Sequence, residues 1–129
     1  MSILRLSEDS GSEEVLPFAT MVHELLSLPV TMRSKNKKGV RLENGKIVDK
    51  NYTGPVLEEA LSKNCVIHKT PDRGAYKGIP VVVTPIYDND GKAIAAVGVV
   101  DVVSTIDLAS VFGNYPQIVR QVEERKSSY

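Results

Sequence analysis

The chain has 129 residues, of which 42% are hydrophobic and 25% charged, a composition typical of a globular protein rather than a disordered one. Its 16 basic and 16 acidic side chains cancel, which argues against a nucleic-acid-binding protein, because such proteins usually carry a basic surplus. The single cysteine, Cys65, excludes an internal disulfide, and the most apolar run, 93–100, is far too short to span a membrane. The start of the chain turns acidic too early for a signal peptide. We therefore expect one domain over residues 1–129 in a cytoplasmic protein that makes no membrane contact.

The N-terminal region predicts an amphipathic helix. From Val15 onward, apolar residues recur every three or four positions, which is the spacing of one face of an α-helix. The pattern predicts a helix over about 13–28, which ends before Pro29. Residues 30–32 are then expected to be extended chain.

A β-hairpin and a short helix are predicted next. The segments 40–43 and 46–49 flank Asn44-Gly45, the pair best suited to a two-residue turn in which both residues have a positive φ. Pro55 is preset for the first turn of a helix, and the apolar residues that follow it form one helical face. The sequence therefore predicts a hairpin and then a helix that starts near Pro55.

Three further strands are predicted, over 65–68, 79–87 and 92–103. The last two are apolar on each face, so both faces of the sheet should be covered there, and the short turn between them makes them antiparallel. Residues 69–78 form a loop that contains proline and glycine. Within the last strand, Gly98 indicates either a bulge or a close approach by another backbone.

The C-terminal region predicts helices over about 105–125, with Ser104 and Asp107 resembling a capping box at their start. A five-stranded antiparallel sheet flanked by helices satisfies this order of elements. It is an α+β architecture that resembles PAS, Cache, GAF and profilin-like domains. A parallel sheet with crossover helices does not fit, because most consecutive strands are joined by tight turns.

Several stretches carry resemblances to known families. The segment 78–101 resembles the final hairpin of PAS-like and Cache-like sensor domains, through its Pro-Ile pair, its Asp-Gly turn and a strand with Ile and Gly that ends near Asp101. Over nearly the whole chain, LPVTMRSKNKKGVR at 28–41, YTGPVLEE at 52–59 and YKGIP at 76–80 resemble a family of small uncharacterised proteins from methanogenic archaea. The first resemblance implies a sensor-domain fold and the second a cytoplasmic archaeal protein. Neither implies a particular activity.

The loop between the third and fourth predicted strands is one candidate for anion binding. It carries Lys69, Arg73 and Lys77 together with two glycines, which let backbone N–H groups approach a carboxylate or a phosphate. Tyr76 either lies over a ligand or anchors the loop. The alternative interpretation of the three cations is a solvated loop that binds nothing.

A second candidate is the start of the short helix. A helix N-terminus beside the Thr53 hydroxyl is suited to an anion, and Tyr52 would line the same pocket. In PAS-like sheets the short helices after the first hairpin commonly wall the ligand cavity, so the resemblance implies a similar position here. The alternative is an ordinary helix start with nothing bound.

A basic run lies ahead of the hairpin, with five cations and no acid within nine residues: Arg33, Lys35, Lys37, Lys38 and Arg41. Such a run could bind nucleic acid or an acidic protein segment. The acidic N-terminal residues and the small number of aromatic residues argue against nucleic acid. We expect a solvated approach to the hairpin and no nucleic-acid partner.

Catalytic and metal sites find little support in the sequence. His23 and His68 lack carboxylates at metal-binding spacing, so we expect structural roles for both and neither a metal nor a cofactor. Asp101 is expected to accept hydrogen bonds from the helix that starts at Ser104. An enzyme would require a deep cleft that joins His68 with Asp101 or Cys65. We therefore expect no enzymatic activity.

Together these patterns predict a small-molecule-binding sensory or regulatory domain. It would hold a carboxylate-bearing metabolite between the sheet and the short helix, and act in trans without an effector domain of its own. The residues expected to make the polar contacts are Arg41, Tyr52, Thr53, His68, Arg73, Tyr76 and Lys77. The alternative is a homodimeric interaction or adaptor protein with no small ligand, joined through the amphipathic helices Val15 to Leu28 and Pro116 to Glu123. The two are compatible in a dimeric sensor.

Overall fold

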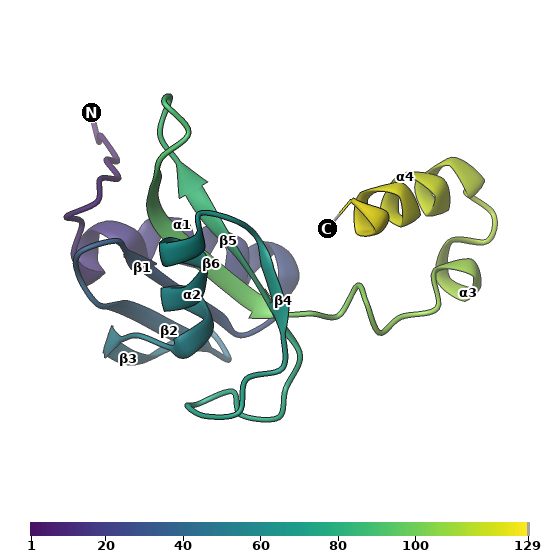
Figure 1. Cartoon of the computed structure of the whole chain (residues 1–129), viewed down its shortest axis with the longest axis horizontal. Helices are drawn as coiled ribbons and strands as arrows, with labels where there is room; N and C mark the ends of the chain where they lie inside the picture. Colours follow the sequence, from purple (N-terminus) through teal and green to yellow (C-terminus); the bar gives the residue numbers. More distant parts are fainter. Residues whose placement is uncertain (129) are drawn as a thin grey trace.

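The computed structural model describes residues 1–128 and forms a six-stranded antiparallel sheet with a helix against each face (Figure 1). The elements in chain order are α1 (Ser12–Leu26), β1 (Val30–Ser34), β2 (Gly39–Glu43), β3 (Lys46–Tyr52), α2 (Pro55–Lys63), β4 (Ile67–Lys69), β5 (Val81–Tyr87), β6 (Ala93–Val100), α3 (Leu108–Phe112) and α4 (Pro116–Ser127). None of the helices in this described part is long and apolar enough to cross a membrane.

The strand order is β3-β2-β1-β6-β5-β4, so the first and last strands of the chain lie side by side in the middle of the sheet. Val30 lies opposite Val99, and Ser34 lies opposite Ala95. The α+β class is confirmed, but the expected count of five strands is wrong. Residues 30–32, which were expected to be extended chain, belong to the sixth strand, β1. This strand pairs with β6 more than 60 residues away, a pairing that no local pattern reveals.

The two faces of the sheet carry separate hydrophobic cores. On one face α1 packs on β1 and β2, and on the other α2 packs on β5 and β6. The first core contains Val15, Ala19, Val30, Met32, Val40, Leu42 and Ala95, and the second contains Tyr52, Val56, Leu57, Ala60, Leu61, Val81, Val83, Ala93 and Ala96. The expectation that β5 and β6 are covered on both faces is confirmed, since both strands contribute to both cores.

The β2–β3 hairpin has the predicted turn. Asn44 and Gly45 have φ values of 53° and 73°, which only a residue tolerant of the left-handed region adopts readily. The backbone N–H of Gly45 donates to Nε2 of His23 at 2.8 Å, and Nδ1 of the same ring lies 2.6 Å from the carbonyl oxygen of Leu28. His23 therefore ties the end of α1 to the hairpin, which confirms its structural role.

The C-terminal region departs from the prediction in detail. Two helices stand where helices over about 105–125 are expected, and they pack on each other beyond the end of β6 rather than covering the sheet (Figure 1). The predicted capping box is wrong, because Asp107 is itself the N-cap residue of α3. One of its carboxylate oxygens accepts hydrogen bonds from the backbone N–H groups of Ala109 and Ser110 at 3.1 and 3.3 Å.

Candidate functional site

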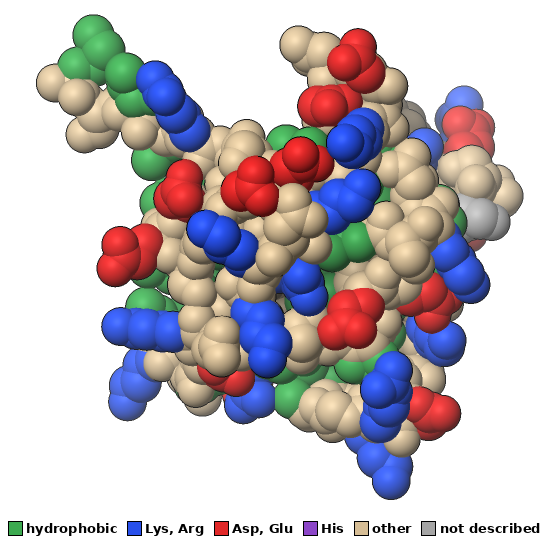
Figure 2. All heavy atoms as spheres, turned by 60° about the vertical axis from the view of Figure 1, so that its left-hand side comes forward, with side chains coloured by type: hydrophobic (Ala, Val, Ile, Leu, Met, Phe, Trp, Pro, Cys, Tyr) green, Lys and Arg blue, Asp and Glu red, His purple; other side chains and the backbone are tan. Residues whose placement is uncertain are grey.

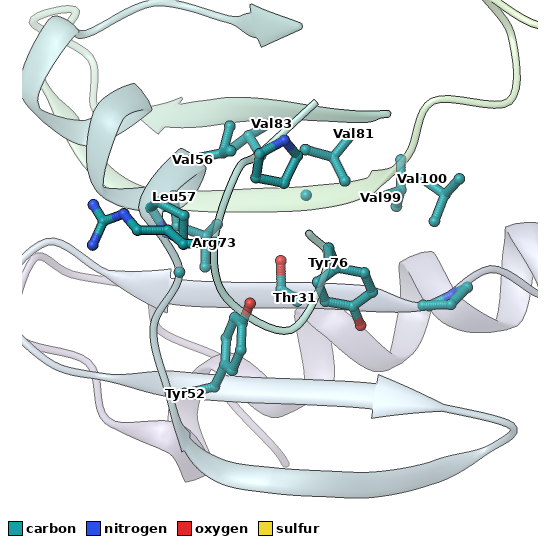
Figure 3. A pocket seen from close by; sticks show the side chains of 15 residues that line it. Thr31, Tyr52, Val56, Leu57, Arg73, Tyr76, Val81, Val83, Val99 and Val100 are labelled. Atoms are coloured by element: carbon teal, nitrogen blue, oxygen red, sulfur yellow. The ribbon is translucent and has the colours of Figure 1, made fainter. Parts of the chain in front are cut away.

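An apolar cleft lies on the α2 face of the sheet, beneath the loop formed by residues 70–80 (Figure 3). Its walls come from α2, from that loop and from the inward-facing side chains of the sheet. The main lining residues are Thr31, Tyr52, Val56, Leu57, Tyr76, Val81, Val83 and Val99. The cavity volume is about 30 Å³, which is room for one water molecule. A larger molecule therefore enters only if the 70–80 loop moves.

The 70–80 loop is closed on itself. The backbone N–H of Gly78 donates to the carbonyl oxygen of Pro71 at 2.9 Å, and the backbone N–H of Ile79 donates to the carbonyl oxygen of Tyr76 at 3.0 Å. Gly74 and Gly78 have φ values of 88° and 80°, so the tight path of the loop depends on glycine at both positions. Because these bonds lie within the loop, it can move as one unit without losing them.

Tyr76 attaches this loop to the sheet. Its ring packs against the α2-face core, and its hydroxyl donates a hydrogen bond to Oε2 of Glu43 at 2.9 Å. Burial and the hydrogen bond to Glu43 raise the pKa of Tyr76 far above its ordinary value. The phenol therefore stays protonated and remains a hydrogen-bond donor throughout the neutral pH range.

Arg41 lies between two aromatic rings beside the cleft. Its guanidinium carbon is 6.0 Å from the ring centre of Tyr52 and 5.9 Å from that of Tyr76, within the range of cation–π attraction. Its Nε lies 3.3 Å from Oε2 of Glu43 but is not aligned for a hydrogen bond, so the contact is an ion pair without a directed bond. These residues, Arg41, Glu43, Tyr52 and Tyr76, are called the Arg41 cluster below.

The terminal nitrogens of Arg41 form no hydrogen bond with any residue from 1 to 128. The side chain keeps 27% of its surface exposed, so these donors are reachable from outside. A guanidinium presents its donors in a planar fork that matches a carboxylate. The cluster therefore offers a fixed, partly desolvated cation beside an apolar cavity.

The structure brings three of the seven expected ligand-binding residues together, namely Arg41, Tyr52 and Tyr76. Arg73 lines the cleft, but its guanidinium points away from the rings of Tyr52 and Tyr76 (Figure 3). Lys77 is exposed on the loop.

The remaining two expected residues lie outside the Arg41 cluster. Thr53 accepts a hydrogen bond from Arg33 and donates one to Glu58, each at 2.8 Å, so its hydroxyl is engaged in holding the start of α2. His68 belongs to the edge strand β4, where it pairs with Asp101. Neither Thr53 nor His68 lines the cleft beneath Tyr76.

Glu43 is the residue of the Arg41 cluster that no sequence pattern singled out. A signal for it exists, since Arg41 and Glu43 are two positions apart on one strand and therefore point to the same face of the sheet. The hairpin prediction placed both residues on a strand but did not say which face a loop would cover. The loop covers this face through Tyr76, and both side chains are half-buried there.

The basic run divides between the inside and the outside of the protein. Arg33 has only 13% of its side chain exposed and donates to the carbonyls of Ser34 and Lys35 at 2.8 and 3.0 Å. Arg41 belongs to the Arg41 cluster, whereas Lys35, Lys37 and Lys38 are exposed. Figure 2 shows acidic side chains among the basic ones rather than an unbroken basic patch.

His68 and Asp101 form a hydrogen-bonded pair at the β4 edge of the sheet, with Nδ1 and Oδ2 2.8 Å apart. Asp101 is 6% exposed and also accepts from the backbone N–H of Ser104 at 3.3 Å, as expected for a structural carboxylate. The pair borders a broad groove of about 1220 Å³ rather than a deep cleft. Cys65 is exposed and makes no hydrogen bond to this pair.

The free energy of unfolding is expected to depend on Asp101 at acid pH. Burial raises the pKa of Asp101, but hydrogen bonds from His68 and Ser104 outweigh it and hold the pKa below its ordinary value of 3.8. The stabilisation is therefore complete above pH 3.8 and is lost as the pH falls through the lower folded-state pKa. Asp101→Asn should lose stability near neutral pH and approach wild type once the pH falls below the folded-state pKa of Asp101, as measured by urea unfolding.

Asp90→Asn is the matched control, because the Asp90 carboxylate makes no hydrogen bond within residues 1–128. Equal losses of stability in the two variants at neutral pH would show that the Asp101 pair contributes nothing specific.

No group of three or more histidine, cysteine, aspartate or glutamate side chains is placed to hold a metal ion among residues 1–128.

Comparison with known proteins places the cleft within a shared segment. Residues 22–103 match the model of a family described as an uncharacterised protein conserved in archaea (DUF2111). The uncharacterised protein MJ0405 of Methanocaldococcus jannaschii is 50% identical over 105 residues, which cover 81% of this chain and 79% of that protein. The segment matched by the family model includes the whole Arg41 cluster and the 70–80 loop, whereas α3 and α4 lie beyond it.

Proposed function

We propose that this chain, which belongs to the archaeal family DUF2111, is a cytoplasmic sensory or regulatory domain that binds a small carboxylate-bearing metabolite. The carboxylate binds Arg41, and the apolar part of the ligand occupies the cleft beneath the 70–80 loop. The bound state is passed in trans to a separate protein.

One observation carries this proposal: the guanidinium of Arg41 is held between two tyrosine rings while its terminal nitrogens have no partner among the described residues. A buried or half-buried cation normally has a counter-ion with good geometry, and here the Glu43 contact engages only Nε. A ligand carboxylate would supply the two parallel hydrogen bonds that the fork lacks.

The apolar lining supports a ligand with a hydrocarbon part. Val56 and Leu57 of α2 line the cleft together with Val81 and Val83 of β5 (Figure 3). Outward movement of the 70–80 loop enlarges the cleft, and the free energy of burying an apolar group there compensates for the burial that the Tyr76 ring loses. The PAS-like or Cache-like character is also part of this proposal, and the position of α2 as a cavity wall after the first hairpin supports it.

Isothermal titration with matched carboxylates and amides tests the proposal. Benzoate and isovalerate should bind the wild-type protein, whereas benzamide and isovaleramide, which have the same shape without the charge, should bind at least about tenfold more weakly. Absence of binding by every carboxylate at millimolar concentration, or equal binding of acid and amide, would overturn the proposal.

A homodimeric interaction protein is the second candidate, and α4 favours it. This helix packs on α3 and not on the sheet, which leaves Ile118 39% exposed and Val119 and Val122 only half-buried. The outer side of α1 also exposes Met21 and Leu25. An apolar stripe on a polar helix is a contact surface for a second copy of this chain.

Sedimentation equilibrium tests this candidate. The wild-type protein should form dimers at micromolar concentration, and the double variant Ile118→Asp, Val122→Asp should be monomeric with an unchanged helix content. Glu124→Gln, on the opposite side of α4, should leave the dimer intact. A wild-type protein that stays monomeric at high micromolar concentration would contradict the dimer.

A further inference from the structure

The Arg41 cluster already contains a carboxylate. Oε2 of Glu43 lies 3.3 Å from Nε of Arg41 and accepts the hydroxyl hydrogen bond of Tyr76 at 2.9 Å. These are the two interactions that a ligand carboxylate would seek at this position, one with a guanidinium and one with a neutral phenol donor. The side chain of Glu43 therefore occupies a position that suits the carboxylate of a ligand.

The two partners in this ion pair differ in how they are held. Glu43 is the last residue of β2, next to the turn, and its side chain is 33% exposed and reaches solvent. Arg41 lies two residues further inside the strand, between the Tyr52 and Tyr76 rings, and its Nε is buried. Glu43 is thus the more easily displaced of the two.

The charge balance indicates exchange rather than addition. With Glu43 in place, Arg41 is already neutralised, and a second carboxylate would be repelled by the first. Asp49, opposite Arg41 on β3, directs its carboxylate to the backbone N–H of Asn51 at 2.8 Å and forms no ion pair with Arg41. Once the Glu43 side chain turns away, the Arg41 guanidinium has room for one carboxylate, that of the ligand.

We propose that Glu43 is a built-in stand-in for the ligand carboxylate, which a monocarboxylate with a small apolar tail replaces on binding. This inference rests on the proposed function and names the ligand class and its competitor within the chain. Tyr76 then passes its hydrogen bond from Glu43 to the ligand. The 70–80 loop, which contacts β2 through that hydrogen bond and through the Tyr76 ring on Arg41, moves with Tyr76 as the tail enters the cleft.

Removing the competitor should strengthen binding. We expect Glu43→Ala to bind benzoate about tenfold more tightly than wild type in isothermal titration, because a charge-assisted contact no longer opposes the ligand. Glu43→Gln retains the size of the side chain and its hydrogen-bond acceptor for Tyr76 but not the charge, so its affinity should lie between the two. Benzamide should not gain affinity in either variant.

Glu58→Gln is the matched control. The Glu58 carboxylate is on the same side of the molecule, accepts a hydrogen bond from Thr53 at 2.8 Å and lies 4.0 Å from Arg33. The Glu58→Gln substitution therefore removes one negative charge, as Glu43→Gln does, without changing the Arg41 cluster. Its affinity for benzoate should equal that of wild type. A similar gain in the Glu58 variant would assign the effect to overall charge and overturn the inference.

The outcomes separate this inference from the proposed function. If wild type prefers benzoate to benzamide but Glu43→Ala and Glu43→Gln bind benzoate no more tightly, the proposed role of Glu43 is overturned and the carboxylate site remains. No binding of benzoate or isovalerate by wild type or either folded Glu43 variant overturns both. Helix content from circular dichroism shows that the variants are folded, and the near-isosteric glutamine variant provides the result if alanine disrupts the hairpin.

Discussion

Arg41→Gln is expected to remove the preference for benzoate over benzamide. Glutamine keeps a polar side chain at this position of β2 but lacks the charge and the fork of donors, so the acid and the amide should bind equally weakly. The loss of two charge-assisted hydrogen bonds corresponds to a fall in benzoate affinity of about tenfold or more. Isothermal titration of the variant with both compounds measures it.

Arg73→Gln is the informative control for this change. Arg73 also lines the cleft and is also a cation, but it points away from the rings and is exposed. We expect its removal to change benzoate affinity little, since the contribution of an exposed charge is screened by water. A large loss in the Arg73 variant with none in the Arg41 variant would move the carboxylate site to the loop.

Gly39→Ala is expected to destabilise the fold strongly. A Cβ atom at Gly39 would lie 1.8 Å from the carbonyl oxygen of Met32 and 2.7 Å from Cα of Arg33, so the backbone of β1 or β2 must shift. Both strands are central to the core on the α1 face, and Met32 is fully buried. We expect a loss of about 3 kcal/mol or more in the free energy of unfolding, measured by urea denaturation.

Gly11→Ala controls for the general cost of replacing glycine. No atom lies within 4 Å of a Cβ placed at Gly11, and its φ of −84° is accessible to any residue. The change should cost about 1 kcal/mol or less. Equal effects of the two substitutions would mean that β2 does not approach β1 as closely as described.

The sequence predicted those parts of the fold that local patterns determine. Asn44 and Gly45 specify their turn through φ values that few residues adopt, and the apolar residues of β5 and β6 indicate burial wherever the strands pair. The strand β1 was missed because its partner residues are distant in sequence, and hydrogen bonding between distant segments leaves no periodic signal.

The candidate site was predicted in part for a related reason. Arg41, Tyr52 and Tyr76 were each identified as residue types suited to a ligand, but their meeting depends on how the 70–80 loop folds over β2, which composition does not reveal. His68 was grouped with them because it precedes the loop in sequence. The β4–β5 pairing instead places it at the sheet edge beside Asp101.

A crystal structure of the protein grown with benzoate would show whether the ligand takes the place of Glu43. We expect the benzoate carboxylate on the terminal nitrogens of Arg41 and the ring in the cleft beneath the 70–80 loop. The Glu43 side chain should be turned to solvent, and Tyr76 should be displaced with its loop. A structure in which Tyr76 still donates to Glu43, the cleft remains closed and benzoate is absent from Arg41 would contradict this expectation.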